Sequence, residues 1–413
     1  MTTQPDTGYL PPMLNPFEPG FFDNPYEQYA ALREHEPVHL TPVGAWMVSR
    51  HADVSRLLRD PKLSVEARNA NAPAFADPEI EAIMESRRDR GSRAILNIDP
   101  PDHHRIRRLV AKVFTPRMIE ELRPQILALT DAHLDAVIAR GDGTMDIIAD
   151  LAFPLPFTVI SEMMGIPEGR DRNELRAWSG ALVKTFDPII TVDDVRAAMD
   201  ASDNFLAYMT ETIAAKRSHP DDRLLSAMIA AEEDGDRLTE HELIDNVMLL
   251  FIAGHETTVN LIGNGMLALL RNPDQLARLR DDPALDVNAA DELLRYDSPV
   301  QFSGRFALES FEIGDRTIDA GSPIMTCLAA ANRDPEVFAD PNRLDLGRPN
   351  ANQHVSFGGG FHHCLGNALA RIEGQVAIGS LVRRLPGLAL ASDTQQWNGR
   401  IVLRGLQSLP VTL

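Results

Sequence analysis

The chain has 413 residues, of which 44% are hydrophobic and 24% are charged, and this composition is ordinary for a folded globular protein. The formal net charge of −20 argues against nucleic-acid binding, because that binding depends on lysine and arginine that neutralise phosphates. Cys327 and Cys364 are the only cysteines, which excludes a disulfide framework and a four-thiolate zinc or iron–sulfur site.

The beginning of the chain shows no targeting signal. Residues 1–20 lack both a basic segment and an apolar core. The longest strictly apolar run, residues 247–254, is far shorter than the roughly 20 residues that a bilayer span requires. We therefore expect a cytoplasmic protein that does not enter a membrane. No linker divides the chain, so we expect a loose tail at residues 1–14 and a single domain over residues 15–413. We also expect a monomer.

Apolar residues at three- and four-residue spacing predict helices over most of the chain. The predicted helices cover residues 26–35, 118–140, 148–164, 195–217, 240–271, 289–296 and 366–385. Two segments, 63–93 and 186–192, follow neither a helical nor a strand pattern. They are interpreted equally well as binding loops or as plain surface insertions.

Strand signals are few and short. Apolar residues alternate with other residues over 38–48, as in a hairpin. They alternate again over 306–324, where turn dipeptides interrupt the pattern. Residues 401–403 and 411–413 could add two short strands near the end of the chain. The sequence therefore predicts a mainly α fold with a minor antiparallel β portion.

The most informative segment is Phe357-Gly-Gly-Gly-Phe-His-His-Cys364-Leu-Gly366, which precedes a helical pattern. Successive glycines allow the backbone to approach a flat, bulky group. A sulfur at a helix N-terminus is favoured as the thiolate, the form that binds metals. The residues leave three other readings open: a buried neutral cysteine, a nucleophilic cysteine paired with histidine, and a zinc site. The zinc reading is weak, because His362, His363 and Cys364 are consecutive and make a poor tetrahedral chelate.

This segment resembles the haem-binding signature of the cytochrome P450 family, and the likeness extends over residues 15–413. It implies a cytochrome P450-like fold that holds haem b between a long central helix and the cysteine-containing loop, with Cys364 as the axial iron ligand. The positions that carry the likeness or are expected to contact haem in this loop are Phe357, Gly358, Gly360, His362, Cys364 and Gly366, and the pattern continues through Ala368-Leu369-Ala370-Arg371 and Glu373.

A second matching segment lies near residues 99–107, where Asp and Pro signal a helix start. His103 and Arg107 are four residues apart and share one helix face, which alone would indicate only a solvated basic surface. The resemblance implies that they bind the haem propionates, with Arg305 as a third propionate ligand. Arg105 and its neighbours fall off that face, where they could meet an acidic redox partner.

Glu292 and Arg295 are three residues apart on a predicted helix. On a surface, such a pair contributes only a few tenths of a kcal/mol. The resemblance implies instead that they join Arg348 in supporting the haem loop. These three residues are predicted to be structural and to take no part in the chemistry.

The long helix over residues 240–271 carries Ala253-Gly-His-Glu-Thr-Thr258 inside an apolar stretch. Thr257 could merely bond back to the carbonyl of Ala253, and Glu256 could pair with a core cation. The segment also resembles the family's acid–alcohol motif. That likeness implies that Gly254 leaves room beside the haem, that Thr257 holds water or a reduced oxygen species, and that Glu256 supplies protons.

The resemblance predicts a haem-thiolate monooxygenase. It would activate O₂ with two electrons supplied through a ferredoxin or flavodoxin and its reductase. One oxygen atom would enter a hydrophobic substrate, by hydroxylation or epoxidation, and the expected substrates are secondary metabolites, steroids, terpenoids or fatty acids. Ile252, Val300, Phe302 and Ile401 are expected to line an apolar substrate pocket. A peroxygenase should lack Glu256 and Thr257, a non-catalytic binding module should lack that pair or Cys364, and a haem sensor should carry a fused output domain.

Overall fold

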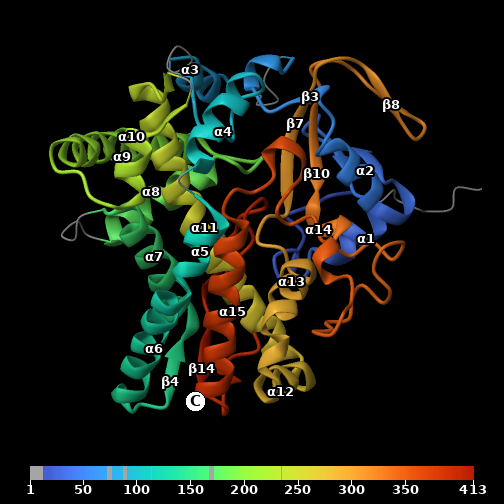
Figure 1. Cartoon of the computed structure of the whole chain (residues 1–413). Coiled ribbons are helices and arrows are strands. Elements are labelled where there is room, and N and C mark those ends of the chain that lie inside the picture. The colour runs from blue at the N-terminus through green and yellow to red at the C-terminus, as the bar shows by residue number, and fades with distance from the viewer. Residues whose placement is uncertain (1–12, 72–76, 87–90, 113, 167–171, 234) are drawn as a thin grey trace, which may run out of the picture.

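The computed structural model describes residues 13–71, 77–86, 91–112, 114–166, 172–233 and 235–413. Residues 1–12, most of the predicted tail, lie outside this range, as do parts of the uncommitted segment 63–93. Within the described part, helices dominate and the strands are short, which confirms the predicted mainly α fold (Figure 1). No helix in these ranges is both long and apolar enough to cross a membrane.

The α-helices are α1 (Tyr26–His35), α2 (His51–Leu57), α3 (Pro78–Ser86), α4 (Asp102–Lys112), α5 (Pro116–Glu121), α6 (Arg123–Arg140), α7 (Pro154–Met164), α8 (Arg172–Lys184), α9 (Val192–Ser218), α10 (Leu224–Ala230), α11 (Glu240–Arg271), α12 (Pro273–Asp281), α13 (Asp286–Tyr296), α14 (Leu328–Ala331) and α15 (Asn367–Arg384). A short π-helical turn, Ile148–Ala152, precedes α7.

The largest sheet has the strand order β1-β2-β10-β7-β3 and lies beside α1 and α2 (Figure 1). Its strands are β1 (Val38–Leu40), β2 (Trp46–Val48), β10 (Pro323–Cys327), β7 (Phe302–Ala307) and β3 (Leu63–Ser64). Its pairs are antiparallel except β2 with β10, which is parallel. The prediction of an antiparallel β portion therefore holds with this one exception.

The remaining strands form smaller antiparallel sheets. One has three strands, β11 (Ala389–Leu390), β14 (Pro410–Thr412) and β4 (Thr144–Asp146). Three two-stranded ribbons pair β5 (Glu232–Glu233) with β6 (Asp236–Arg237), β8 (Phe311–Ile313) with β9 (Arg316–Ile318), and β12 (Gln396–Trp397) with β13 (Leu406–Ser408).

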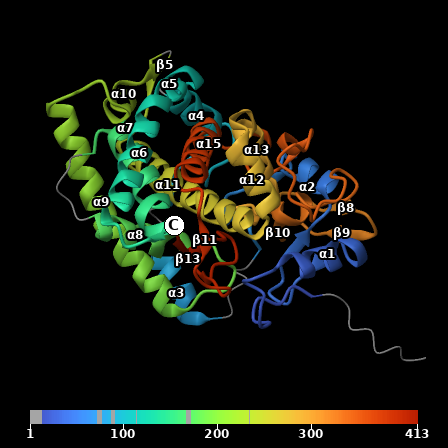
Figure 2. The ribbon, with the colours of Figure 1, turned by 90° about the horizontal axis from the view of Figure 1, so that it is seen from below.

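The long helix α11 passes through the middle of the molecule, with other helices on both sides (Figure 2). It begins with a capping box, in which Thr239 accepts a hydrogen bond from the Glu242 N–H and its own N–H donates to the Glu242 carboxylate. Its middle packs against α7, α9 and α15. This packing holds the buried side of the helix, which includes Phe251 and Val259, against the main hydrophobic core.

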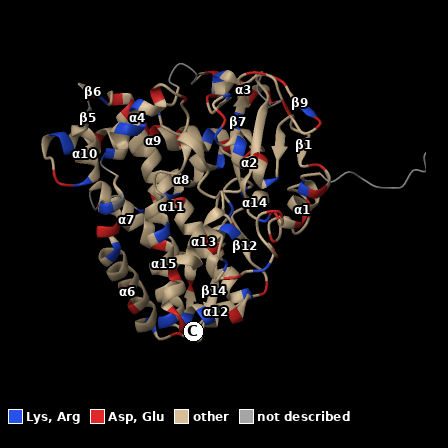
Figure 3. Cartoon of the chain, turned by 45° about the vertical axis from the view of Figure 1, so that its right-hand side comes forward, with Lys and Arg blue, Asp and Glu red and all other residues tan. Residues whose placement is uncertain are grey.

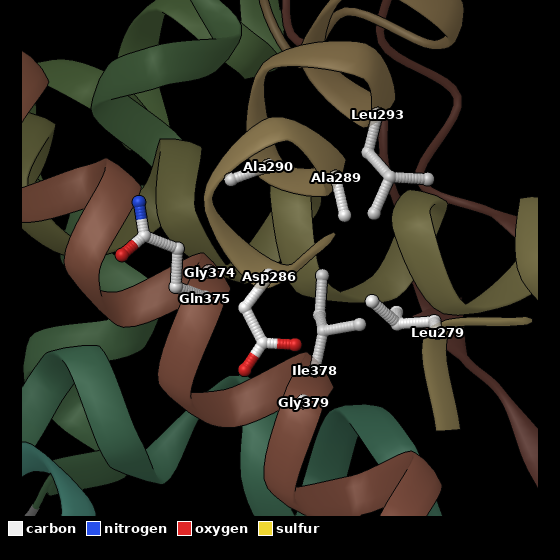
Figure 4. Close-up of a pocket in the computed structure, with 9 residues that line it drawn as sticks. All are labelled: Leu279, Asp286, Ala289, Ala290, Leu293, Gly374, Gln375, Ile378 and Gly379. Atoms are coloured by element: carbon white, nitrogen blue, oxygen red, sulfur yellow. The ribbon is translucent and has the colours of Figure 1, made fainter. Parts of the chain in front are cut away.

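Small residues allow α13 and α15 to approach each other closely. Ala289 and Ala290 on α13 face Gly374 and Gly379 on α15, and the crease between the helices has no room for water (Figure 4). A methyl group on Gly379 would lie 2.7 Å from the Asp286 carboxylate. This close contact orients α15, and with it the loop that precedes α15.

Three predicted elements differ from the structure. The predicted helix over residues 118–140 is divided at Leu122, because Pro124 begins a second helix there. Residues 401–403 form a turn with a single bridge between Val300 and Leu403, where a strand had been predicted. The uncommitted segment 63–93 contains β3 and α3.

Candidate active site

Cys364 lies between a 3₁₀ turn, Gly360–His362, and the N-terminal end of α15. Its backbone N–H donates to the Phe357 carbonyl over 2.9 Å, and its own carbonyl accepts from Asn367 over 2.8 Å. Desolvation of the sulfur raises the pKa of the Cys364 thiol, although the Gly366 backbone and two guanidiniums oppose that rise. The helix terminus alone therefore does not make this sulfur a thiolate, and ligation by a metal would have to deprotonate it.

Glycine is required at two positions of this loop for different reasons. Gly360 has φ +64°, and a Cβ at this position would lie 2.7 Å from the Leu58 carbonyl oxygen at the end of α2. Gly358 has φ +67°, and its nearest such neighbour is 4.0 Å away. The backbone at Gly360 thus lies close to the end of α2, as the glycine run predicted for some bulky neighbour. The space beside Gly358 is open.

His103, Arg107 and Arg305 converge on this loop from two elements. His103 on α4 is fully buried, and its ring lies 4.4 Å from the His362 ring. Arg107 donates to the His363 carbonyl over 2.7 Å. Arg305 on β7 is 7% exposed, and its acceptors among the described residues are both neutral, the Ser303 hydroxyl and the Gly304 carbonyl.

Burial shifts the pKa values of Arg305 and His103. It lowers the pKa of Arg305 to about 10, opposed only by Asp99, and it lowers the pKa of His103 to about 4 with help from Arg107. No carboxylate in the described ranges forms an ion pair with Arg107 or Arg305. The Nε2 atoms of His103 and His362 are buried and have no hydrogen-bond partner among the residues whose positions the structure gives. A buried ligand with two carboxylates would satisfy this set, so these residues fit haem b.

The alternative zinc reading finds no support. Among the residues with described positions, no three side chains of His, Cys, Asp or Glu gather as a metal site. A single thiolate beside buried cations matches a porphyrin iron, which needs only one protein ligand, better than it matches zinc.

Thr257 and Glu256 lie where α11 loses its protein cover. Ala253 is exposed even though Phe251 and His255 on the same helix are fully buried. The Thr257 hydroxyl donates to the Ala253 carbonyl over 2.9 Å, which is the local bond that the sequence also allowed. This bond uses the only hydroxyl proton and leaves the oxygen free to accept a hydrogen bond.

Glu256 faces away from the core toward a cavity of about 370 Å³ between α8, α11 and residues 398–407. Its Oε2 atom accepts a hydrogen bond from Arg400 Nη1 over 3.2 Å. The sequence reading missed Arg400, because it is 144 residues away from Glu256 and belongs to no recognised pattern. The suggestion that Glu256 pairs with a cation is therefore correct, but that cation lines a cavity and is not in the core.

Glu292, Arg295 and Arg348 form one buried cluster. Arg295 donates to both Glu292 carboxylate oxygens over 2.7 and 2.8 Å, and Arg348 Nε donates to the same two oxygens over 3.1 Å each. Both guanidiniums also bond to backbone carbonyls in residues 332–343. The cluster thus ties α13 to the long segment that leads into the cysteine loop.

The four predicted substrate residues are not gathered in one cavity. Phe302 packs edge-to-face on Tyr29 at 5.7 Å and shares a buried cluster with Ile401. Val300 packs against the cluster around the large sheet, and Ile252 against the main core. Phe302 is thus a core residue in this structure.

One basic and one acidic residue have surroundings that the sequence did not predict. Arg105 forms ion pairs with Glu242 and Asp236, so its charge is used within the molecule. Glu373 on α15 is 1% exposed, and burial raises its pKa to about 8, with the Thr258 hydroxyl opposing. The sequence marked Glu373 only as part of a motif.

Comparisons with known proteins agree with this site. The family model described as Cytochrome P450 matches residues 41–284 and 287–396. The chain is 44% identical to cytochrome P450 107B1 of Saccharopolyspora erythraea, over 98% of each chain. It is 42% identical to vitamin D(3) 25-hydroxylase of Pseudonocardia autotrophica, over 96% of each.

Solved structures agree as well. The cytochrome P450 PksS of the Bacillus subtilis bacillaene polyketide synthase superposes with a TM-score of 0.86 at 37% identity, covering 97% of this chain and 100% of that one. P450BioI, solved with a ligated acyl carrier protein, gives 0.86 at 36% identity, covering 95% and 98%. The chain therefore belongs to the cytochrome P450 family, and it is a monooxygenase that uses haem b and acts on hydrophobic small molecules.

Proposed function

We propose that Cys364 is the axial ligand of haem b and that Arg305, His103 and Arg107 hold its propionates. The observation that carries this assignment is Arg305, a guanidinium that is 7% exposed and has only neutral acceptors. Such a group is costly to bury unless an anion joins it. Phe357, Gly358, His362 and Gly366 surround Cys364 in the loop and are assigned to the cofactor's immediate environment.

Haem b supplies the iron at which dioxygen is activated and from which one oxygen atom passes to the substrate. The chain supplies the surroundings for this chemistry. The Cys364 thiolate would hold the iron and supply electron density to it. Gly254 lies on the packed side of α11, where a Cβ would come within 3.0 Å of Ile160 on α7, so the glycine allows these two helices to approach closely.

Glu256 and Thr257 are assigned to proton delivery. Glu256 is partly exposed to a cavity and can exchange protons with water there. Thr257 presents an oxygen that can accept a hydrogen bond on the uncovered face of the same helix. The presence of this pair favours a monooxygenase over a peroxygenase or a binding module.

The substrate class is proposed from relatives. Curated relatives include a vitamin D(3) 25-hydroxylase and the polyketide enzyme PksS, and solved relatives hold testosterone, myristic acid and tirandamycin C. We assign this chain a secondary metabolite, steroid, terpenoid or fatty acid as substrate, hydroxylated or epoxidised. Ile401, Val300 and Ile252 remain the proposed apolar contacts, with Phe302 as support behind them.

Electrons are proposed to come from a ferredoxin or flavodoxin with its reductase, and the protein is proposed to act as a monomer with one domain over residues 15–413. In the view of Figure 3, Lys and Arg are interspersed with Asp and Glu over the outer helices.

The proposed activity is tested by a panel of testosterone, myristic acid and vitamin D3. Compounds that convert the ferric holoenzyme from low to high spin are then turned over with a ferredoxin, or a flavodoxin, and labelled dioxygen. The proposal predicts that at least one compound gains a single labelled oxygen atom and that Glu256→Gln slows this reaction. Incorporation of label from water, or none from dioxygen with every compound that binds, would contradict it.

A further inference from the structure

The cavity beside Glu256 has an unusual lining. Arg176 and Arg400 are its cations, Glu256 is its only acid, and Asn260 contributes a buried amide whose Nδ2 atom has no partner within the described ranges. Its volume of about 370 Å³ is far larger than the roughly 10–15 Å³ of such space that a single water molecule needs. The lining therefore suits an ordered group of water molecules that reaches one carboxylate.

Arg400 is bonded to two helices at once. Its Nη1 donates to Glu256 Oε2 on α11 over 3.2 Å, and its Nη2 donates to the Gly180 carbonyl on α8 over 3.2 Å. The other nearby base, His255, donates from Nδ1 to the Phe251 carbonyl over 2.7 Å. Its Nε2 lies 3.8 Å from Glu256 Oε1, beyond hydrogen-bond distance. Arg400 is thus the side chain that fixes the Glu256 carboxylate.

The turn that carries Arg400 is itself fixed by a buried acid. Asp187, just after α8, is 2% exposed. Its Oδ1 atom accepts the backbone N–H groups of Ile401 and Val402 over 3.0 and 2.8 Å, and its Oδ2 atom accepts from Lys184 over 3.1 Å. Removal of such an acceptor would leave two buried N–H groups without partners.

We propose that Arg400 is the positioning residue of Glu256: it holds the carboxylate at the water cavity, and Asp187 and Gly180 tie this position to the end of α8. Proton supply is thereby linked to the segment after α8, which packs through Ile189 in the same cluster as the substrate-side residue Ile401. This inference rests on the proposed role of Glu256. It identifies two residues that act through another group: Arg400 positions Glu256, and Asp187 supports the turn that carries Arg400.

The strength of the contact suits a group that must move. The Glu256 and Arg400 side chains are 15% and 17% exposed, and they share one hydrogen bond of 3.2 Å instead of a bidentate pair. A singly bonded, partly hydrated pair is weaker than a fully buried or bidentate one. Glu256 can therefore leave Arg400 to pass on a proton and return to it to collect another.

The test compares holoenzyme variants during NADPH oxidation through a ferredoxin and its reductase, without organic substrate. Complete reduction of one O₂ to two waters uses four electrons and four protons, whereas release of H₂O₂ uses two of each. A poorly positioned acid should therefore shift the products toward H₂O₂. Arg400→Ala is expected to raise the H₂O₂ fraction severalfold, and guanidinium ion at millimolar concentration, which the cavity can admit, should restore the parent value.

Two matched variants separate position from charge and from folding. Arg176→Ala removes a cation that stacks over Phe153 at 4.1 Å in the same cavity, and it should keep the parent H₂O₂ fraction. Asp187→Asn retains the oxygen that accepts both backbone N–H groups and should resemble the parent, whereas Asp187→Ala should resemble Arg400→Ala. A crystal structure of the Arg400→Ala holoenzyme should show the Glu256 carboxylate displaced from the cavity.

An unchanged H₂O₂ fraction in Arg400→Ala, an equal rise in Arg176→Ala, or an unmoved Glu256 would overturn the inference. The carbon monoxide spectrum distinguishes this failure from failure of the proposed function. A thiolate-type spectrum in every variant, with a raised H₂O₂ fraction in Glu256→Gln but not in Arg400→Ala, would exclude only the role of Arg400. The parent H₂O₂ fraction in Glu256→Gln would exclude the role of Glu256 on which the inference rests, and absence of the thiolate-type spectrum in the parent would exclude the proposed cofactor site.

Discussion

Replacing Glu292 by alanine removes the one carboxylate that neutralises two buried arginines. Arg295 and Arg348 lose two hydrogen bonds each, and the Asp345 N–H loses its 2.9 Å bond to the same side chain. Burial already lowers the pKa of Arg295, and Glu292 is what opposes that effect. Breaking a buried pair typically costs about 3–5 kcal/mol. Because two guanidiniums share this carboxylate, we expect a loss near the upper end, about 5 kcal/mol.

The assay is urea unfolding of the parent and Glu292→Ala, followed by circular dichroism, with the free energy taken from midpoint and slope. Typical domains are stable by only about 5–15 kcal/mol, so the variant should be recovered poorly or with a much lower midpoint. Glu121→Ala, which breaks an exposed pair with Arg117, is the control and should unfold like the parent. A loss of less than about 1 kcal/mol in Glu292→Ala would refute the reasoning, because it would place this cluster among ordinary surface pairs.

Three further predictions address the cofactor site, the relay and a buried acid. Arg305→Leu should release haem to apomyoglobin about ten- to a hundredfold faster, because one charge-assisted hydrogen bond contributes about 1.5–3 kcal/mol; an unchanged transfer rate would remove Arg305 from the propionate site. Thr257→Ala should convert more of the consumed dioxygen to H₂O₂ with a bound panel compound, and undiminished product yield per NADPH would argue against its role. Burial raises the pKa of Glu373 to about 8 in the folded state, well above its ordinary value of about 4.5. Between these two pH values the folded state keeps a proton that the unfolded state loses. The free energy of unfolding therefore falls as the pH rises from about 4.5 through 8. Glu373→Gln should therefore lose less stability than the parent between about pH 5 and pH 8 in urea titrations, and parallel curves would contradict the shift.

The sequence pattern predicted those helices that are determined by residues close together in the chain. The helix Glu240–Arg271 was predicted with its correct bounds, because apolar periodicity continues over its whole length and Thr239 caps it. The helix Tyr26–His35 was also predicted correctly. The division at Leu122 was missed because the apolar periodicity continues across it, and only Pro124 signals a second start.

Contacts between distant parts of the chain could not be read from spacing. Arg348 was joined to Glu292 only through the family resemblance, and their 3.1 Å contacts depend on how residues 332–348 fold back onto α13. Arg400 and Asp187 carry no motif, and their partners Glu256 and Ile401 are more than a hundred residues away. Phe302 was expected beside substrate, but its ring packs on Tyr29, a contact that no strand pattern indicates.

The central claim is that Cys364 ligates the iron as a thiolate. Its most direct test is the spectrum of the dithionite-reduced protein with carbon monoxide, recorded beside Cys364→Ser. The account predicts a strongly red-shifted Soret band in the parent and its loss in the variant, because the serine hydroxyl cannot replace the thiolate as an electron donor. The same band in Cys364→Ser, or a parent band at the position of histidine-ligated haem, would contradict the claim.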